Sequence, residues 1–386
     1  APCTVFQKSS YKGLRTTRYM RYDESMVTKE IIHQIPKVEL HDHLDGGLRI
    51  PTILALAREQ GVTLPADDEH GLHEYFVRGK KEKSLALYLE PFAVTISVMQ
   101  TKAALTRVAY EAVEDLAGEH VVYAELRFAP ILHTRGGLSL DEVVQAVLDG
   151  IQKGTRKFNI HIGLLLCAMR NQDPKISRRI AELAVAFADR GVVGFDLAGD
   201  EIGHPPKDHL DAFQYIRKQN FNITIHSGEA FGIESIWQAI QICGAHRIGH
   251  GVRLVEDMSI EGSRIEQKGS LSSFILDRRI PMEMCLTSNV GTGAVADYAS
   301  HPFPILFRNK YRVFLCCDNR LMSDTTLTHE MEIASQYYGL NLRDLEKITI
   351  NAMKSAFIHH EQKLSLIYNV IKEGYAEIRT RYGLTD

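Results

Sequence analysis

Apolar residues gather in eight short runs along the chain, and most of these runs are separated by segments with helical periodicity. Several runs are apolar almost throughout, as in residues 161–169. Such runs are typical of strands that are covered on both faces, as in a parallel sheet. The pattern predicts strands at residues 36–43, 121–129, 161–169, 192–198, 222–228, 247–250, 281–286 and 312–318.

Between the runs, apolar residues recur at intervals of three and four positions, which is the spacing of one helix face. The clearest helical patterns cover residues 141–157, 176–190, 209–219, 232–243 and 269–279. Strands and helices that alternate eight times predict an α/β protein built as a single closed (β/α)8 barrel of the TIM type.

Two segments depart from this alternation. Residues 52–118 contain several helical patterns, at 53–60, 84–100 and 103–118, and are too long for one crossover. We expect a helical insertion after the first strand that roofs the barrel mouth. The C-terminal tail, residues 342–386, is strongly helical and is expected to close the structure. With no repeat or Pro/Gly-rich linker, one domain over residues 31–386 is predicted.

Composition narrows the class of protein. The 386 residues carry a net charge of −3, which gives no basic field for nucleic acid. The longest apolar runs are too short to span a membrane. The six cysteines show no CxxC spacing, so we expect reduced, buried thiols in a cytoplasmic protein. Residues 1–22 carry five Lys or Arg and no Asp or Glu, and we expect residues 1–30 to form a poorly structured extension.

The candidate chemistry lies at the ends of the predicted strands. His41 and His43 are two positions apart on a strand and therefore project to the same face. His226 and Asp318 end two later strands, and active sites of (β/α)8 barrels lie at the carboxyl ends of their strands. Three histidines and one aspartate form a nitrogen and oxygen ligand set for a divalent ion with an open position. Taken alone, His226 would also fit a core histidine and Asp318 a turn carboxylate.

Two further residues are candidates for proton transfer. Glu229 follows His226 across a Ser-Gly turn, and a buried carboxyl beside a metal pocket can act as a general acid. The alternative is a surface glutamate near the start of the next helix. His250, between Gly249 and Gly251, would take a proton from metal-bound water or stabilise the resulting hydroxide. Its alternative is a structural histidine.

Two other polar pairs are interpreted as structural. Glu125 and Arg127 share one face of the second strand, which favours a buried ion pair over contact with a substrate. Cys316 lies one layer below Asp318 on the eighth strand, so we expect it to pack in the core rather than bind metal.

Taken together, six motifs resemble the adenosine deaminase family. They are HDHLDG at 41–46, LAGDE at 197–201, HSGE at 226–229, GHG at 249–251, TSNVGTGA at 287–294 and DN at 318–319. The resemblance covers about residues 36–360, with the motifs in the family's order. It implies a zinc-dependent barrel that hydrolyses adenosine and 2′-deoxyadenosine to inosine and 2′-deoxyinosine, with release of ammonia.

The same resemblance implies a role for each site residue. One zinc ion per chain would be held by His41, His43, His226 and Asp318. Glu229 would protonate purine N1 and His250 would serve the attacking water. The substrate would also meet four groups, namely the backbone of Gly199, the side chains of Asp45 and His43 at the ribose 5′-hydroxyl, and Asn319 at purine N7.

Two positions depart from the common family pattern. Asn319 stands where many members have Asp, and Cys317 where they have Thr. An amide can donate a hydrogen bond to purine N7 at any pH, so Asn319 keeps the role. Neither change removes a catalytic group, although the effect of the Cys316–Cys317 pair is open.

Three alternative functions differ from this one in the residues that they require. A deaminase of free adenine or another amino-purine shares the fold, but related adenine deaminases typically have Glu in place of Asp45. A binding protein without turnover would show a broken ligand set. A two-metal phosphotriesterase-type hydrolase would need a bridging lysine late in a middle strand, and none is visible. The sequence leaves open the native metal, the oligomeric state and the preference between adenosine and 2′-deoxyadenosine.

Overall fold

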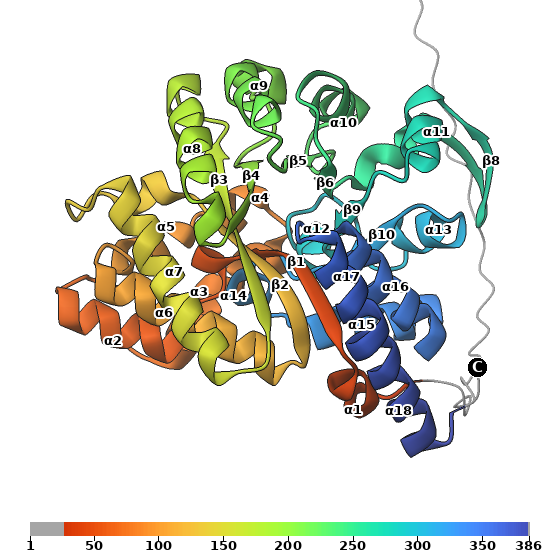
Figure 1. Ribbon diagram of the computed structural model, residues 1–386, viewed down its shortest axis with the longest axis horizontal. Coiled ribbons are helices and arrows are strands. Elements are labelled where there is room, and N and C mark those ends of the chain that lie inside the picture. The colour runs from red at the N-terminus through yellow and green to blue at the C-terminus, as the bar shows by residue number, and fades with distance from the viewer. Residues whose placement is uncertain (1–26, 385–386) are drawn as a thin grey trace, which may run out of the picture.

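The computed structural model describes residues 27–384, and its centre is a barrel of parallel strands (Figure 1). The predicted N-terminal extension lies outside the described residues except for its last four positions. The barrel strands are β1 (Lys37–His43), β2 (Val121–Phe128), β3 (His161–Met169), β4 (Val192–Ala198), β5 (Thr224–Ser227), β6 (Arg247–His250), β9 (Met282–Met284) and β10 (Val313–Leu315). An antiparallel hairpin of β7 (Met258–Glu261) and β8 (Arg264–Lys268) stands apart from them.

The eight parallel strands close on themselves. They form two four-stranded sheets, ordered β1-β2-β3-β4 and β10-β9-β6-β5. Single parallel bridges join the sheets at both edges, between Phe195 and Ile223 and between Asp42 and Asp318. Each predicted strand is present, so the expected (β/α)8 barrel is confirmed. The bridge at Asp318 also places the first and last strands, which carry candidate metal ligands, side by side.

Helices surround the barrel and cover its mouth (Figure 1). The helices up to β6 are α1 (Lys29–Gln34), α2 (Ile50–Gln60), α3 (Glu69–Glu82), α4 (Leu85–Leu89), α5 (Phe92–Val98), α6 (Lys102–Gly118), α7 (Leu140–Lys157), α8 (Pro174–Ala186), α9 (Leu210–Lys218) and α10 (Ile233–Trp237). Those after β8 are α11 (Ser270–Asp277), α12 (Leu286–Gly291), α13 (Phe303–Arg308), α14 (Arg320–Ser323), α15 (Leu327–Tyr338), α16 (Leu342–Ser355), α17 (His360–Leu366) and α18 (Lys372–Tyr382).

Short turns of other helix types complete the chain. The 3-10 turns are Leu44–Gly46, Pro130–His133, Ala188–Arg190, Pro206–His209 and Val252–Asp257, and the π turns are Gln238–Ile242 and Ile367–Ile371. Among the described residues, no helix is long and apolar enough to cross a membrane.

Local sequence explains where several helices begin and end. Ser139 and Glu142 form a reciprocal capping box that starts α7. The predicted helix at 84–100 is two helices, because Pro91 has no N–H to continue α4 and instead stands at the start of α5. The predicted insertion is confirmed as α2 to α6. Helix α3 was not predicted: Leu72, Tyr75 and Phe76 have helical spacing, but most of the other residues in the segment are polar or charged.

The barrel interior is polar beneath the site, although an apolar core surrounds it. Glu125, Arg127, Arg247 and Glu283 are all buried at 0–1% exposure. The prediction of buried ion pairing rather than substrate contact is confirmed for Glu125 and Arg127, but the two residues do not pair with each other. Glu125 pairs with Arg247, and Arg127 pairs with both Glu283 and Asp196. The closed barrel brings charged side chains from different strands closer together than two side chains that are two positions apart on one strand. This buried charge network supports the candidate site from below.

Candidate active site

A cavity of about 300 Å³ lies at the carboxyl ends of the barrel strands. Eight of the nine predicted site residues line it: His43, Asp45, Gly199, His226, Glu229, His250, Asp318 and Asn319. The ninth, His41, is fully buried directly beneath. The structure therefore brings together residues that are separated by up to 278 positions in the sequence.

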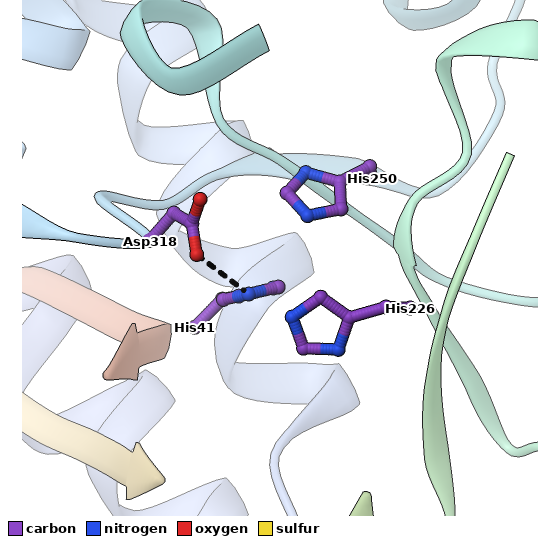
Figure 2. Close-up of side chains that lie close together, drawn as sticks. All are labelled: His41, His226, His250 and Asp318. Carbon is purple, nitrogen blue, oxygen red and sulfur yellow. Dashed lines mark ion pairs between the residues drawn. The ribbon is translucent and has the colours of Figure 1, made fainter. Parts of the chain in front are cut away.

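Imidazole nitrogens and a carboxylate oxygen converge at the floor of this cavity. Asp318 Oδ1 lies 3.2 Å from His41 Nε2 and 3.4 Å from His43 Nε2. His43 Nε2 is also 3.1 Å from His226 Nε2. Figure 2 shows the side chains of His41, His226, His250 and Asp318 pointing toward one another, and one ligand atom from each lies within 4.8 Å of all the others. Both His43 and His250 are thus close enough to belong to a metal-binding group.

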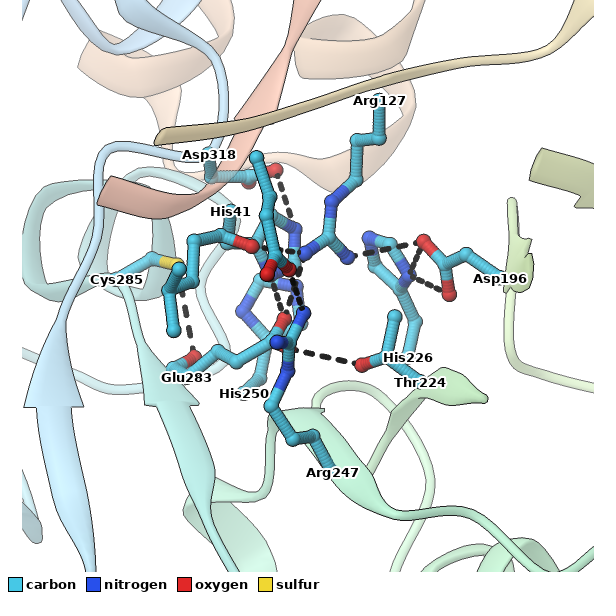
Figure 3. A network of polar contacts seen from close by, with 12 residues as sticks. His41, Arg127, Asp196, Thr224, His226, Arg247, His250, Glu283, Cys285 and Asp318 are labelled. Carbon is cyan, nitrogen blue, oxygen red and sulfur yellow. Dashed lines mark hydrogen bonds and ion pairs between the residues drawn. The ribbon is translucent and has the colours of Figure 1, made fainter. Parts of the chain in front are cut away.

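Two buried carboxylates stand behind the histidines (Figure 3). Glu283 Oε2 is 2.8 Å from His41 Nδ1, and Asp196 Oδ1 is 3.2 Å from His226 Nδ1. A carboxylate at Nδ1 holds a proton there and leaves the Nε2 lone pair free for a metal.

Both carboxylates are held in the charged form. Burial alone would raise the pKa of Asp196, but the charges of His226 and Arg127 outweigh it and bring the pKa below its usual value. Burial opposes ionisation of Glu283 in the same way, and Arg127 and Arg247 keep its pKa well below the usual range.

The protonation states of two candidate ligands also suit a metal. Burial lowers the pKa of His43 well below its usual value, with a smaller contribution from His226 and His41, so the ring is neutral. Burial would raise the pKa of Asp318, but the imidazole of His41 beside it, with the neighbouring His250 and His43, holds the pKa well below the usual range. Ser288 Oγ donates to the other oxygen, Asp318 Oδ2, at 2.6 Å. Neutral imidazole and ionised carboxylate are the ligand forms that bind a divalent ion.

Two of the site residues have a strained backbone. His250 and Asp318 have φ angles of 63° and 64°, in the left-handed region that non-glycine residues rarely adopt. Such conformations cost free energy, persist where the surrounding structure enforces them, and occur often at functional sites. His250 is the last residue of β6, Asp318 lies three positions after the end of β10, and both residues line the cavity.

Glu229 sits on a tightly held loop at the cavity wall. The carboxylate of Glu201 accepts hydrogen bonds from four consecutive backbone N–H groups, of residues 228 to 231, at 2.7–3.0 Å. Thr292 Oγ1 donates to Glu229 Oε1 at 3.1 Å, and His250 Nε2 lies 3.6 Å from Glu229 Oε2. The Glu229 side chain is therefore fixed beside the candidate metal group.

The predicted substrate contacts offer unused polar atoms. Asp45 Oδ1 and Asn319 Oδ1 are buried and have no hydrogen-bond partner in the described structure. Asn319 Nδ2 donates to the hydroxyl of Tyr88 at 3.2 Å. Gly199 lines the cavity with a φ of 102°, a conformation that favours glycine. Buried polar atoms without partners are uncommon in folded proteins, and the unpaired Asp45 Oδ1 could accept a substrate hydroxyl. Purine N7 is an acceptor and would need the Asn319 Nδ2 group as its donor, not the unpaired Oδ1.

The cavity roof comes from the helical insertion. Leu85, Tyr88 and Leu89 of α4 and Phe92 and Ile96 of α5 line it with apolar surface. This confirms that the insertion covers the barrel mouth. An apolar roof over polar groups suits a flat heteroaromatic molecule with a few hydrogen-bonding atoms.

The sequence assigned no role to several residues that hold the site together, although four of them lie in the motifs at 197–201 and 287–294. They are Tyr88, Asp196, Glu201, Glu283, Ser288, Asn289 and Thr292. A usable sign was present for Asp196 and Glu283, because each is a single acidic residue inside an otherwise apolar strand. Charged residues are almost never fully buried unless paired.

A parallel barrel with histidines and an aspartate at the ends of its strands, backed by buried carboxylates, defines a class: the metal-dependent hydrolases of the barrel type. Comparison with known proteins gives the family. The family model for adenosine deaminase matches residues 36–373. The adenosine deaminase of Mycobacterium sp. strain JLS is 53% identical over 356 residues, which cover 91% of this chain and 98% of that protein.

Solved structures agree. The N6-methyl-AMP deaminase from Arabidopsis thaliana is 30% identical, with a TM-score of 0.78 over 91% of this chain and 100% of that one. An adenine deaminase from Arthrobacter aurescens is 23% identical, with a TM-score of 0.79 over 89% and 98%, and shares the fold. The chain belongs to the adenosine deaminase family, whose members are metal-dependent hydrolases of C–N bonds.

Proposed function

We propose that this enzyme catalyses the hydrolytic deamination of adenosine and 2′-deoxyadenosine, with inosine or 2′-deoxyinosine and ammonia as products. The curated relatives at 51–53% identity are named adenosine deaminases. The observation that carries the proposal is the convergence of eight predicted site residues on one cavity beneath an apolar roof.

We propose zinc as the metal, one ion per chain, held by His41, His43, His226 and Asp318. The donor set fits, because imidazole nitrogen and carboxylate oxygen suit zinc. His41 Nε2 is buried and lies 3.2 Å from Asp318 Oδ1, so two of the proposed donor atoms already face each other. When bound, the ion would lower the pKa of a water molecule from 15.7 toward about 7 and so make it nucleophilic at neutral pH.

The remaining roles belong to the chain's own groups. Glu229, fixed by Thr292, protonates purine N1 and makes C6 more electrophilic. His250, whose Nε2 lies 3.6 Å from Glu229 Oε2, serves the attacking water. The backbone of Gly199 orients the purine, and Asn319 faces N7. Asp45, together with His43, accepts the ribose 5′-hydroxyl, which is supported by the buried and unpaired Asp45 Oδ1.

The charges of the cavity favour a nucleoside over a 5′-nucleotide. Among the residues described, the cavity lining includes five acidic side chains, Asp45, Asp200, Glu201, Glu229 and Asp318, and neither Arg nor Lys. A 5′-phosphate would approach Asp45 with no cation to pair with it, at a cost in binding free energy. Free adenine would leave the ribose side of the cavity unfilled and lose binding energy that positions C6.

The test compares substrates in a spectrophotometric assay of the metal-loaded enzyme. Adenosine and 2′-deoxyadenosine should both be deaminated, with kcat/KM well above that for adenine or AMP. A higher kcat/KM for AMP or adenine would overturn the nucleoside assignment.

We further propose that residues 31–386 form the catalytic domain and that the protein is cytoplasmic. The domain assignment is supported by the match of the adenosine deaminase family model to residues 36–373. Five cysteines that are buried and free support the second, since free thiols are typical of reducing compartments.

A further inference from the structure

The motif at residues 287–292 has no assigned role, yet it touches three site residues at once. Ser288 Oγ donates to Asp318 Oδ2, and Thr292 Oγ1 donates to Glu229 Oε1. Between them on α12, the side-chain amide of Asn289 lies 3.1 Å from His250 Nδ1. The amide is thus in contact with the nitrogen of His250 that faces away from the cavity.

The direction of this last hydrogen bond follows from a chain of buried groups that begins at the backbone. The N–H of Phe303 donates to His301 Nδ1 at 3.0 Å, and a backbone N–H can only donate. Burial lowers the pKa of His301 to about 3, with a smaller effect from His250, so the ring is neutral. A neutral imidazole whose Nδ1 accepts must carry its proton on Nε2.

That proton sets the orientation of the Asn289 amide. The Nε2–H group of His301 donates a hydrogen bond to Asn289 Oδ1 at 3.2 Å. The amide nitrogen of Asn289 is then the group that faces His250, and it donates to His250 Nδ1. All three side chains are at most 2% exposed, so water does not compete for these positions.

We infer that His301 and Asn289 are positioning residues that hold neutral His250 in the tautomer with its proton on Nε2. This inference rests on the proposed function, in which His250 serves the attacking water. A nitrogen that already carries a proton cannot accept one. Of the two roles open to His250, the tautomer selects donation of a hydrogen bond to the oxygen that gains negative charge, rather than removal of its proton.

The hydrogen-bond partner of Nδ1 also distinguishes His250 from the proposed metal ligands beside it. His41 and His226 have a carboxylate at Nδ1, at 2.8 and 3.2 Å, which leaves Nε2 without a proton. His250 has a donor at Nδ1, which leaves Nε2 with one. His250 therefore stands next to the metal group without a lone pair to offer it, although its distance alone would allow ligation.

The experiment reads the tautomer directly. In zinc-loaded enzyme labelled with 15N-histidine, long-range proton–nitrogen NMR distinguishes the protonated from the bare ring nitrogen, and His250→Gln assigns the signals. The wild type should show a protonated Nε2 and a bare Nδ1. Asn289→Asp keeps the shape but replaces the donor by an acceptor, so the pattern should reverse. The kcat for adenosine should then fall by about 10²–10³-fold, the usual effect of removing one such donor, with KM little changed.

Two controls make the result specific. Asn309→Asp introduces the same charge change at the end of α13 and should leave the His250 signals and kcat unchanged. His301→Leu should mix the two tautomers, and His301→Gln, which keeps a donor and an acceptor, should restore the wild-type pattern.

A bare Nε2 in the wild type, or an Asn289→Asp variant with the wild-type pattern, would overturn the inference. Full turnover in a variant whose pattern has reversed would overturn the donor role of His250. A wild type that shows the expected pattern but does not deaminate nucleosides would instead refute the proposed function.

Discussion

At the scale of single residues, the side chain proposed to transfer a proton has different hydrogen-bond partners from the side chains proposed to bind the metal. Glu229 is held by Thr292 at one oxygen and faces His250 with the other, at 3.1 and 3.6 Å. Among the described residues, its carboxylate forms no hydrogen bond or ion pair with Asp318, Asp196 or Glu283. Its removal should therefore affect chemistry and leave the metal in place.

We predict that Glu229→Gln retains one metal ion per chain and lowers kcat by about 10²–10⁴-fold, the usual contribution of general acid catalysis. Glutamine has the same shape, but its amide has no acidic proton to transfer. Glu234→Gln, an exposed residue on α10, is the matched control and should be fully active. Elemental analysis and steady-state kinetics check the result, and near-normal turnover of Glu229→Gln would place the acid elsewhere.

The second residue-scale prediction concerns Asp45. Its free Oδ1 is expected to accept the ribose 5′-hydroxyl, so Asp45→Ala should lower kcat/KM for adenosine by the equivalent of about 1–3 kcal/mol. The same variant should treat 5′-deoxyadenosine almost as the wild type does, since that substrate lacks the hydroxyl. This double comparison isolates one contact. Equal losses with both substrates would show that Asp45 acts on the site as a whole.

At the scale of elements, the strands were predictable and the contacts between them were not. Buried parallel strands leave apolar runs in the sequence, and their ends mark the barrel mouth, so His41, His226 and Asp318 could be grouped from the sequence alone. Helix α12 could not be, because its six residues mix polar and apolar positions without periodicity. Its side chains act on residues 30 to 63 positions away, and such distances become visible only once the barrel is closed.

The loop at residues 228–231 gives the prediction at this scale. One carboxylate, Glu201, accepts from all four backbone N–H groups, and an amide can offer only one oxygen to them. Glu201→Gln should destabilise the loop by about 1–3 kcal/mol for the donors left unpaired and lower kcat through misplacement of Glu229. Glu182→Gln, on the exposed face of α8, serves as the control. Faster amide hydrogen exchange confined to residues near 228–231 checks the mechanism, and unchanged exchange with unchanged kcat would contradict it.

At the scale of the whole molecule, the candidate ligands come from opposite ends of the barrel sequence. His41 and His43 end β1, His226 lies on β5, and Asp318 follows β10, so the metal group spans the seam where the first and last strands meet. That seam rests on few backbone hydrogen bonds, including the N–H of Asp318 to the carbonyl of His41 at 2.7 Å and the N–H of His43 to the carbonyl of Asp318 at 2.8 Å. A bound metal ion would add a further link between the first and last strands of the barrel.

Metal removal should therefore weaken the fold as well as abolish activity. A ligand that binds only the folded state stabilises it by RT ln(1 + [L]/Kd), which is about 4 kcal/mol when free metal exceeds Kd 1,000-fold. We expect the metal-free protein to unfold on the order of 5–10 °C below the zinc-loaded protein in calorimetry, and added zinc to restore both Tm and turnover. In His226→Ala the Tm should be low with or without chelator, because one ligand is missing. A metal-free protein with the Tm of the loaded enzyme would show that the seam is closed without the ion, and two metal ions per chain would contradict the mononuclear site.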